Sequence, residues 1–81
     1  MKITIRLFAQ LKDLIQEPEL LLESEGAISC REAAGSLGRH YPGVIPILKQ
    51  CVFAHNGVLT SADALLEDGD ELALLPPVSG G

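Results

Sequence analysis

A short apolar run near the end of the sequence is stopped by two consecutive prolines. Residues 71–75 read ELALL, a pattern typical of a β-strand, and Pro76 and Pro77 follow at once. Proline fixes φ near about −65° and has no backbone N–H, so a paired strand cannot continue past Leu75. We therefore expect a folded domain over residues 1–75 and a flexible, extended tail over residues 76–81 that ends in Gly-Gly.

The tail combines rigidity with very small residues. Pro76, Pro77 and Val78 are expected to set its exit direction, and Ser79, Gly80 and Gly81 follow them. Glycine has no Cβ and passes through a slot that excludes other residues, so we predict that the tail inserts into a partner. The reactive group there is the α-carboxylate of Gly81, which is ionised at pH 7 and is a poor electrophile. It needs activation, for example as an acyl-adenylate formed with ATP.

The composition excludes several classes of protein. Eighty-one residues make one small domain, and eleven acidic against six basic residues give a net charge of −5. The basic residues are scattered along the sequence, which argues against nucleic-acid binding: Lys2, Arg6, Lys12, Arg31, Arg39 and Lys49. No apolar stretch is long enough to span a membrane, and the first residues do not resemble a signal peptide. We expect a cytoplasmic protein, and its negative charge allows a partner with a basic docking face.

The sequence offers few groups for chemistry besides the tail. Cys30 and Cys51 lack a metal-binding or redox spacing and are expected in the core. His40 and His55 lie on different elements, and the acidic run of residues 67–71 lacks the ligand periodicity of a calcium loop, so we predict no metal site. Nucleotide-binding loops are also missing. The chain is therefore expected to be a substrate or carrier, not an enzyme by itself, with no bound cofactor and with ATP held by another protein.

Hydrophobic periodicity predicts an α+β fold. Alternating or apolar runs predict strands over residues 2–8, 19–23, 51–55, 58–59 and 71–75. Ser29 and Glu32 fit a capping box that starts the main helix, which ends before Pro42. Shorter helical turns are predicted over residues 9–15 and 44–50, and Gly35 and Gly38 are expected to let the main helix lie close to the sheet. Pairing the last strand parallel to the first gives a β-grasp (ubiquitin-like) arrangement, a mixed sheet of about five strands on one main helix.

A partner surface is expected beside the tail. A strand that alternates between two faces cannot bury Leu72, Leu74 and Leu75 on one side, so Leu74 and Leu75 are candidates for partner contact. Asp70 belongs to the acidic run that precedes this strand. Its solvated charge is a second candidate for docking.

Two stretches resemble a known family. LFAQLKDL over residues 7–14 and HNGVLTSADALLEDGDELALLPPVSGG over residues 55–81 are similar to the small subunit of molybdopterin synthase, the ubiquitin-like sulfur carriers called MoaD. The ending PPVSGG is the specific part of the resemblance, since other ubiquitin-like sulfur carriers keep the two glycines but usually not the prolines. The chain departs from the family at Leu74 and Leu75, where aromatic residues are common.

The resemblance implies a complete scheme for the tail. A ubiquitin-activating-type adenylyltransferase would adenylate Gly81 with ATP, and a sulfur donor would convert the adenylate to a thiocarboxylate. The tail would then enter the large synthase subunit, whose pocket would hold the cyclic pyranopterin precursor, and donate sulfur to the dithiolene of molybdopterin. Members of the family form a heterotetramer with the large subunit.

Other functions fit the same residues. A sulfur carrier for thiazole or cysteine synthesis would share the activation step and differ in the acceptor. A ubiquitin-like modifier would join Gly81 to lysines and produce conjugates of higher mass. A plain interaction domain would not need Gly81 at all.

Overall fold

The computed structural model describes residues 1–77, which form seven strands and four helical segments. The strands are β1 Lys2–Leu7, β2 Glu19–Glu23, β3 Ile28–Ser29, β4 Val52–His55, β5 Val58–Thr60, β6 Leu65–Leu66 and β7 Glu71–Leu75. The helical segments are α1 Ala9–Ile15, α2 Cys30–His40, the 3-10 turn η1 Pro42–Val44 and α3 Ile45–Leu48.

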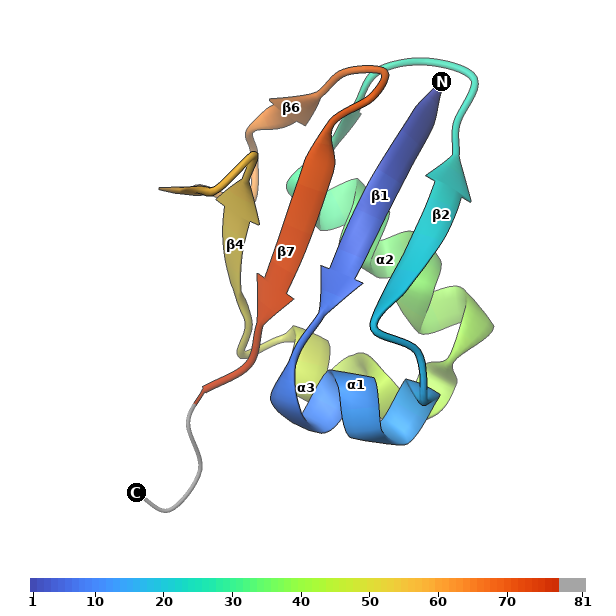
Figure 1. Cartoon of the computed structure of the whole chain (residues 1–81), viewed down its shortest axis with the longest axis vertical. Helices are drawn as coiled ribbons and strands as arrows, with labels where there is room; N and C mark the ends of the chain where they lie inside the picture. Colours follow the sequence, from blue (N-terminus) through green and yellow to red (C-terminus); the bar gives the residue numbers. More distant parts are fainter. Residues whose placement is uncertain (78–81) are drawn as a thin grey trace.

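Five strands form one mixed sheet in the order β2-β1-β7-β4-β5. The last strand, β7, lies at the centre, parallel to β1 and antiparallel to β4 (Figure 1). The expected parallel pairing of the last strand with the first is thus confirmed. β7 is paired on both edges up to Leu74, and Leu75 still pairs with Val52 of β4, so the strand is held to its last residue.

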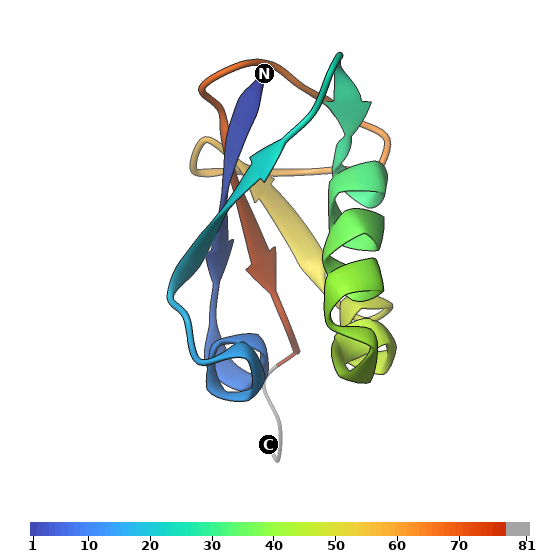
Figure 2. The same ribbon diagram turned by 90° about the vertical axis from the view of Figure 1, so that its right-hand side faces the viewer.

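Helix α2 covers one face of this sheet (Figure 2). Its start is fixed as the sequence predicts: the Glu32 N–H donates to Ser29 Oγ at 3.0 Å, and the Ser29 N–H donates to Glu32 Oε1 at 2.9 Å. This capping box satisfies two of the amides that a helix leaves without partners. The α+β fold and the β-grasp arrangement on one main helix are confirmed.

The core between helix and sheet is aliphatic. Its fully buried side chains come from the inward positions of β1 and β7, from α1 and α2, and from β6: Ile3, Ile5, Leu7, Leu11, Cys30, Leu66, Leu72 and Leu74. Burial of an aliphatic side chain contributes on the order of 2 kcal/mol. The predicted core position of Cys30 is confirmed, and burial raises the pKa of its thiol.

Two details differ from the sequence prediction. The two-residue strands β3 and β6 form a separate small sheet, which pairs Ile28 with Leu66. Such short pairs carry no periodicity that a sequence pattern could reveal. Gly38 faces α3, where an added Cβ would meet Ile45 Cγ1 at 3.0 Å, so this glycine permits a close approach of two helices and not of helix to sheet.

Candidate functional site

The candidate site is the end of β7, the first residues of the tail and the sheet surface around them. Pro76 and Pro77 follow β7 directly, and neither belongs to a strand. β7 therefore ends at Leu75, where the prolines predict it should. Val78, Ser79, Gly80 and Gly81, including the predicted sulfur-carrying residue, lie outside the described residues.

The leucines of β7 divide between the two faces of the sheet. Leu72 and Leu74 point into the core and are both 0% exposed, whereas Glu71, Ala73 and Leu75 lie on the other face and are partly exposed. The prediction that Leu74 forms partner surface is wrong, because the two-residue period of the strand places it beside the buried Leu72. Leu75 remains on the surface and keeps its predicted role as a candidate contact.

An apolar surface surrounds Leu75 on the side of the sheet opposite α2. Val52 pairs with Leu75 across β4 and β7, and Ala54 pairs with both Ala73 and Leu59. Directly paired residues of neighbouring strands share a face, so these five side chains from three strands lie on the same face of the sheet. We call Val52, Leu59, Ala73 and Leu75 the outer patch; Val52 is 54% exposed and Leu59 is 70% exposed.

Charged side chains border the outer patch toward β1. Arg6 pairs with Ala73 in the sheet register, and its Nη1 atom lies 3.3 Å from Oε1 of Glu71. Beyond β1, the surface of β2 carries Glu19 and Glu23. The outer face thus changes from apolar at β5, β4 and the end of β7 to charged at β1 and β2. An apolar area with a polar border is typical of a protein interaction site.

Asp70 has a structural role that the sequence did not indicate. Its Oδ2 atom accepts from the Glu67 N–H at 2.8 Å and lies 2.6 Å from His55 Nε2, while its Oδ1 atom accepts from Asn56 Nδ2 at 3.1 Å. These bonds join the turn after β4 to the turn before β7. Asp70 is therefore not a free docking charge: its side chain is only 15% exposed, and its oxygens are occupied within the domain.

The hydrogen bonds to Asp70 also stabilise the ionised form of its carboxylate. The backbone N–H of Glu67, followed by the side chains of Asn56 and His55, lowers the pKa of the Asp70 carboxyl below its ordinary value. Hydrogen bonds donated to a carboxylate favour its ionised form. The rest of the acidic turn behaves as the sequence predicts, since Glu67 and Asp68 are exposed to solvent.

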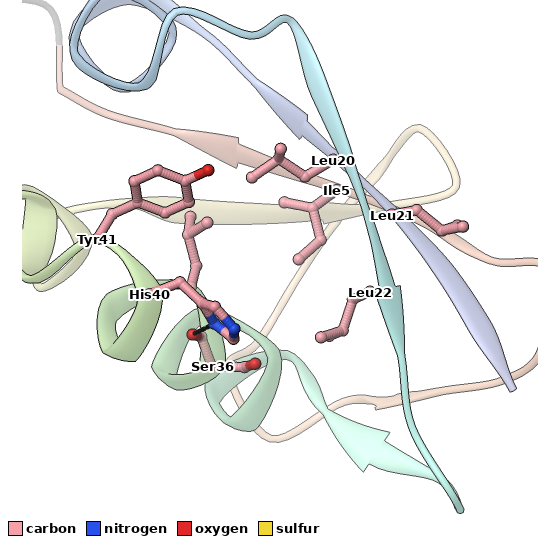
Figure 3. Close-up of a pocket in the computed structure, with 8 residues that line it drawn as sticks. Ile5, Leu20, Leu21, Leu22, Ser36, His40 and Tyr41 are labelled. Carbon is pink, nitrogen blue, oxygen red and sulfur yellow. Dashed lines mark hydrogen bonds between the residues drawn. The ribbon is translucent and has the colours of Figure 1, made fainter.

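His40, at the end of α2, borders a small hollow between α2 and β2. This hollow has a volume of about 170 Å³ and is lined largely by aliphatic side chains, among them Ile5, Leu20 and Leu22, with His40 and Tyr41 at one side (Figure 3). The imidazole Nδ1 of His40 lies 3.0 Å from the carbonyl oxygen of Ser36, one turn earlier on the helix. That contact is local to the helix and brings no second catalytic group to the imidazole.

Residues 1–77 hold neither a metal-binding cluster nor a membrane-spanning helix. Within this part of the chain, no group of three or more His, Cys, Asp or Glu side chains is placed to hold a metal ion. None of the helices described is long and apolar enough to cross a membrane.

Comparison with known proteins gives the family. The model of the ThiS family matches residues 5–81, nearly the whole sequence. The chain belongs to the ThiS family. Among curated ThiS-like relatives, the molybdopterin synthase sulfur carrier subunit of Arabidopsis thaliana is 30% identical over 80 residues, which cover 99% of this chain and 83% of that protein.

Solved structures resemble this ThiS-family chain over its full length. SAMP1, the small archaeal modifier protein 1 of Haloferax volcanii, aligns with a TM-score of 0.87 at 25% identity and full coverage of both chains. A chain from the complex of subunits 1 and 2 of the molybdopterin-converting factor of Helicobacter pylori aligns with a TM-score of 0.69 at 28% identity, again with full coverage of both chains. The resemblance to sulfur carriers is thereby confirmed.

The outer patch was only partly visible in the sequence. The sequence indicates Leu75 from its place in the last strand. It does not indicate Val52 or Leu59, because residues on separate strands come together only through the pairing of β4 with β7 and β5. The alternation of strand residues 51–55 could have shown that one face of this strand is apolar. It could not have shown which strand lies next to it.

Proposed function

We propose that this chain is the sulfur carrier subunit of molybdopterin synthase and that Gly81 carries the sulfur as a thiocarboxylate. The observation that supports the proposal most directly is the match over 99% of the chain to a relative of that name. The sequence PPVSGG supplies a terminus suited to the chemistry. In this scheme the chain holds no cofactor, and ATP is bound by the activating enzyme.

The proposed chemistry has three steps. The Gly81 carboxylate attacks the α-phosphate of ATP and releases pyrophosphate, which leaves an acyl-adenylate. A sulfide equivalent then displaces AMP at the acyl carbon and forms the thiocarboxylate. Its sulfur, a soft nucleophile, attacks a carbon of the pyranopterin precursor and displaces an oxygen substituent from that carbon. Hydrolysis of the resulting acyl–sulfur bond then leaves the sulfur on the pterin and returns the Gly81 carboxylate. Two carriers supply the two sulfurs of the dithiolene.

The fold supports this use of the tail. Because β7 is the central strand, its end is a fixed point from which the tail begins. Pro76, Pro77 and Val78 would direct the tail, Ser79 and Gly80 would pass through the entrance of the partner, and Gly81 would reach the reacting atoms. The catalytic pocket would lie on the large subunit. The resemblance to a chain from a two-subunit complex supports a partner of this kind.

The outer patch is the proposed contact with the large subunit. It is apolar, exposed and located at the strand from which the tail departs, so docking there would place the tail at the partner without reorganising the domain. We further propose a heterotetramer with two copies of each subunit. Activation by a ubiquitin-activating-type adenylyltransferase and a cytoplasmic location complete the scheme and remain predictions.

Intact-mass measurement tests the proposal. The chain is incubated with ATP, a sulfide source and the activating enzyme of its own organism, and the same chain lacking Gly81 serves as the control. We expect a mass gain equal to the replacement of one oxygen by sulfur, localised to Gly81 and absent from the control. An unchanged mass with an activating enzyme that forms the adenylate would contradict sulfur transfer.

A second candidate function is protein modification. It is favoured by the full-length resemblance to small archaeal modifier protein 1 at a TM-score of 0.87. A modifier would attach Gly81 to lysine side chains through isopeptide bonds. Conjugates of higher mass that disappear when Gly81 is deleted would support modification, whereas a cell extract with thiocarboxylate and no conjugates would favour the sulfur carrier alone.

A further inference from the structure

Charge is strongly segregated along this acidic chain. All eleven carboxylate side chains lie within residues 1–32 or 63–81, and none occurs in residues 33–62. That carboxylate-free segment carries Arg39 and Lys49 and forms most of α2, all of α3 and the hairpin of β4 and β5. A chain with a net charge of −5 therefore has one region that is free of negative side chains.

A groove lies in this region, on the helix side of the sheet. It has a volume of about 580 Å³ and is lined by residues of α2, α3 and the start of β4. Its lining is mostly apolar and includes Ala34, Gly35, Gly38, Ile45, Leu48 and Phe53. The floor at Gly35 is open, because an added Cβ there would meet only the end of the Arg39 side chain, at 3.8 Å.

The rim of the groove is cationic. Arg31, Arg39 and Lys49 all border it, so the fold gathers half of the six basic residues that are scattered in the sequence. Arg31 is neutralised by Asp63, whose Oδ1 lies 2.5 Å from its Nη1. Within residues 1–77, neither Arg39 nor Lys49 takes part in an ion pair. Two cations beside an apolar floor are thus available to an outside carboxylate.

We propose that this groove binds a short peptide segment of a partner protein in which apolar side chains are flanked by aspartate or glutamate. The apolar floor fits aliphatic or aromatic side chains, and the two free cations fit the flanking carboxylates. A small phosphate ligand fits less well, because the lining that would surround it is dominated by carbon atoms. The groove would be a docking site additional to the outer patch.

The two surfaces lie on opposite faces of the sheet. Val52 of β4 belongs to the outer patch, while its neighbour Phe53 points to the helix side and lines the groove. A peptide in the groove therefore leaves the outer patch uncovered. The chain could hold one partner by its helices while its tail reacts with another.

Peptide selection followed by binding measurements tests the proposal. A displayed library of short random peptides is selected against the whole chain, and the affinity of each enriched peptide is measured for the natural protein and its variants. Gly35→Met fills the groove, and Arg39→Glu combined with Lys49→Glu reverses its rim. Gly35→Ala leaves the groove open and serves as the matched control, while Leu59→Glu changes only the outer patch. Thermal melts confirm that each variant is folded.

We expect enriched peptides that combine apolar residues with flanking acidic ones. The charge reversal should weaken their binding by about tenfold or more, because it turns two favourable charge interactions into repulsions, and high salt should weaken it as well. Gly35→Met should abolish binding, whereas Gly35→Ala and Leu59→Glu should not change it. Bound peptide should also slow alkylation of Cys51, which lines the groove, while Cys30 is buried.

Four results would overturn the proposal. The first is the absence of enriched peptides. The second is enrichment of peptides without acidic residues, whose binding the charge reversal leaves intact. The third is binding that Leu59→Glu removes and Gly35→Met does not, which would place the peptide on the outer patch. The fourth is displacement of the bound peptide by inorganic phosphate at constant ionic strength, which would identify an anion site instead of a peptide groove.

Discussion

Asp70 shows how one side chain can join two turns. The turn after β4 has positive φ angles at Asn56 and Gly57, 50° and 86°, the geometry that an Asn-Gly hairpin favours. Asn56 also exchanges bonds with β7: its N–H donates to the Glu71 carbonyl, and its Oδ1 accepts from the Glu71 N–H, each at 2.8 Å. Asp70 completes this connection through His55, Asn56 and the Glu67 N–H.

Asp70→Ala should therefore destabilise the domain. It leaves three donors without their acceptor, and the expected loss is about 1–2 kcal/mol of unfolding free energy at pH 7. Glu67→Ala is the control, because it removes the same charge from an exposed side chain of the same turn. Urea unfolding of both variants measures the difference. Equal stability of the two variants would contradict a structural role for Asp70.

The same carboxylate predicts a pH dependence. Its pKa is lowered in the folded state, so its contribution is complete above the unfolded-state pKa, about 3.9, and is lost as pH falls through the folded-state value. The stability difference between the natural chain and Asp70→Ala should thus be constant near neutrality and shrink below about pH 4. Urea unfolding across this pH range measures it. A difference that grows on acidification would have the wrong sign.

At the scale of elements, α2 carries two glycines with different surroundings. An added Cβ at Gly35 meets open space apart from Arg39 Nη1 at 3.8 Å. At Gly38 it would lie 3.0 Å from Ile45 Cγ1 and 3.3 Å from Leu48 Cδ1, so α3 would have to move. The first glycine is tolerated by the helix, and the second is required by the packing of α3 on α2.

The changes in unfolding free energy caused by Gly35→Ala and by Gly38→Ala should therefore differ in sign or size. Alanine at Gly35 should raise the unfolding free energy by up to about 1 kcal/mol through helix propensity. At Gly38 the same gain is opposed by overpacking, which costs about 1–3 kcal/mol. Melting temperatures of the two variants make the comparison. A Gly38→Ala variant as stable as Gly35→Ala would mean that α3 shifts without cost.

These elements also show what a sequence can and cannot reveal. The capping box at Ser29, the Asn56-Gly57 turn and the prolines after Leu75 are local signals, and each boundary they predict is found in the structure. The burial of Leu74 was missed, because it depends on which face of β7 meets α2. The outer patch and the groove likewise depend on strand order and helix packing, which no local pattern encodes.

On the scale of the whole molecule, the sheet presents two different surfaces on one face. The outer patch at β4, β5 and β7 is apolar, whereas the surface of β1 and β2 is mainly charged and carries an isolated leucine, Leu21, which is 62% exposed. Leu59 and Leu21 are thus similar side chains at opposite edges of the same sheet. Leu59 continues the apolar surface of β4 and β7 through Ala54, whereas Leu21 pairs with the polar Thr4 of β1.

These two exposed leucines, one inside and one outside the outer patch, allow a direct test of docking. If the large synthase subunit binds the outer patch, Leu59→Glu should weaken the complex by at least about tenfold, since it places a charge in an apolar contact. Leu21→Glu should leave affinity unchanged. Both positions are exposed, so neither change should alter the unfolding free energy by more than about 0.5 kcal/mol. Calorimetric titration of each variant with the large subunit measures the affinities. If both variants bind as tightly as the natural chain, the outer patch is not the contact surface, and the tail alone would hold the subunits together.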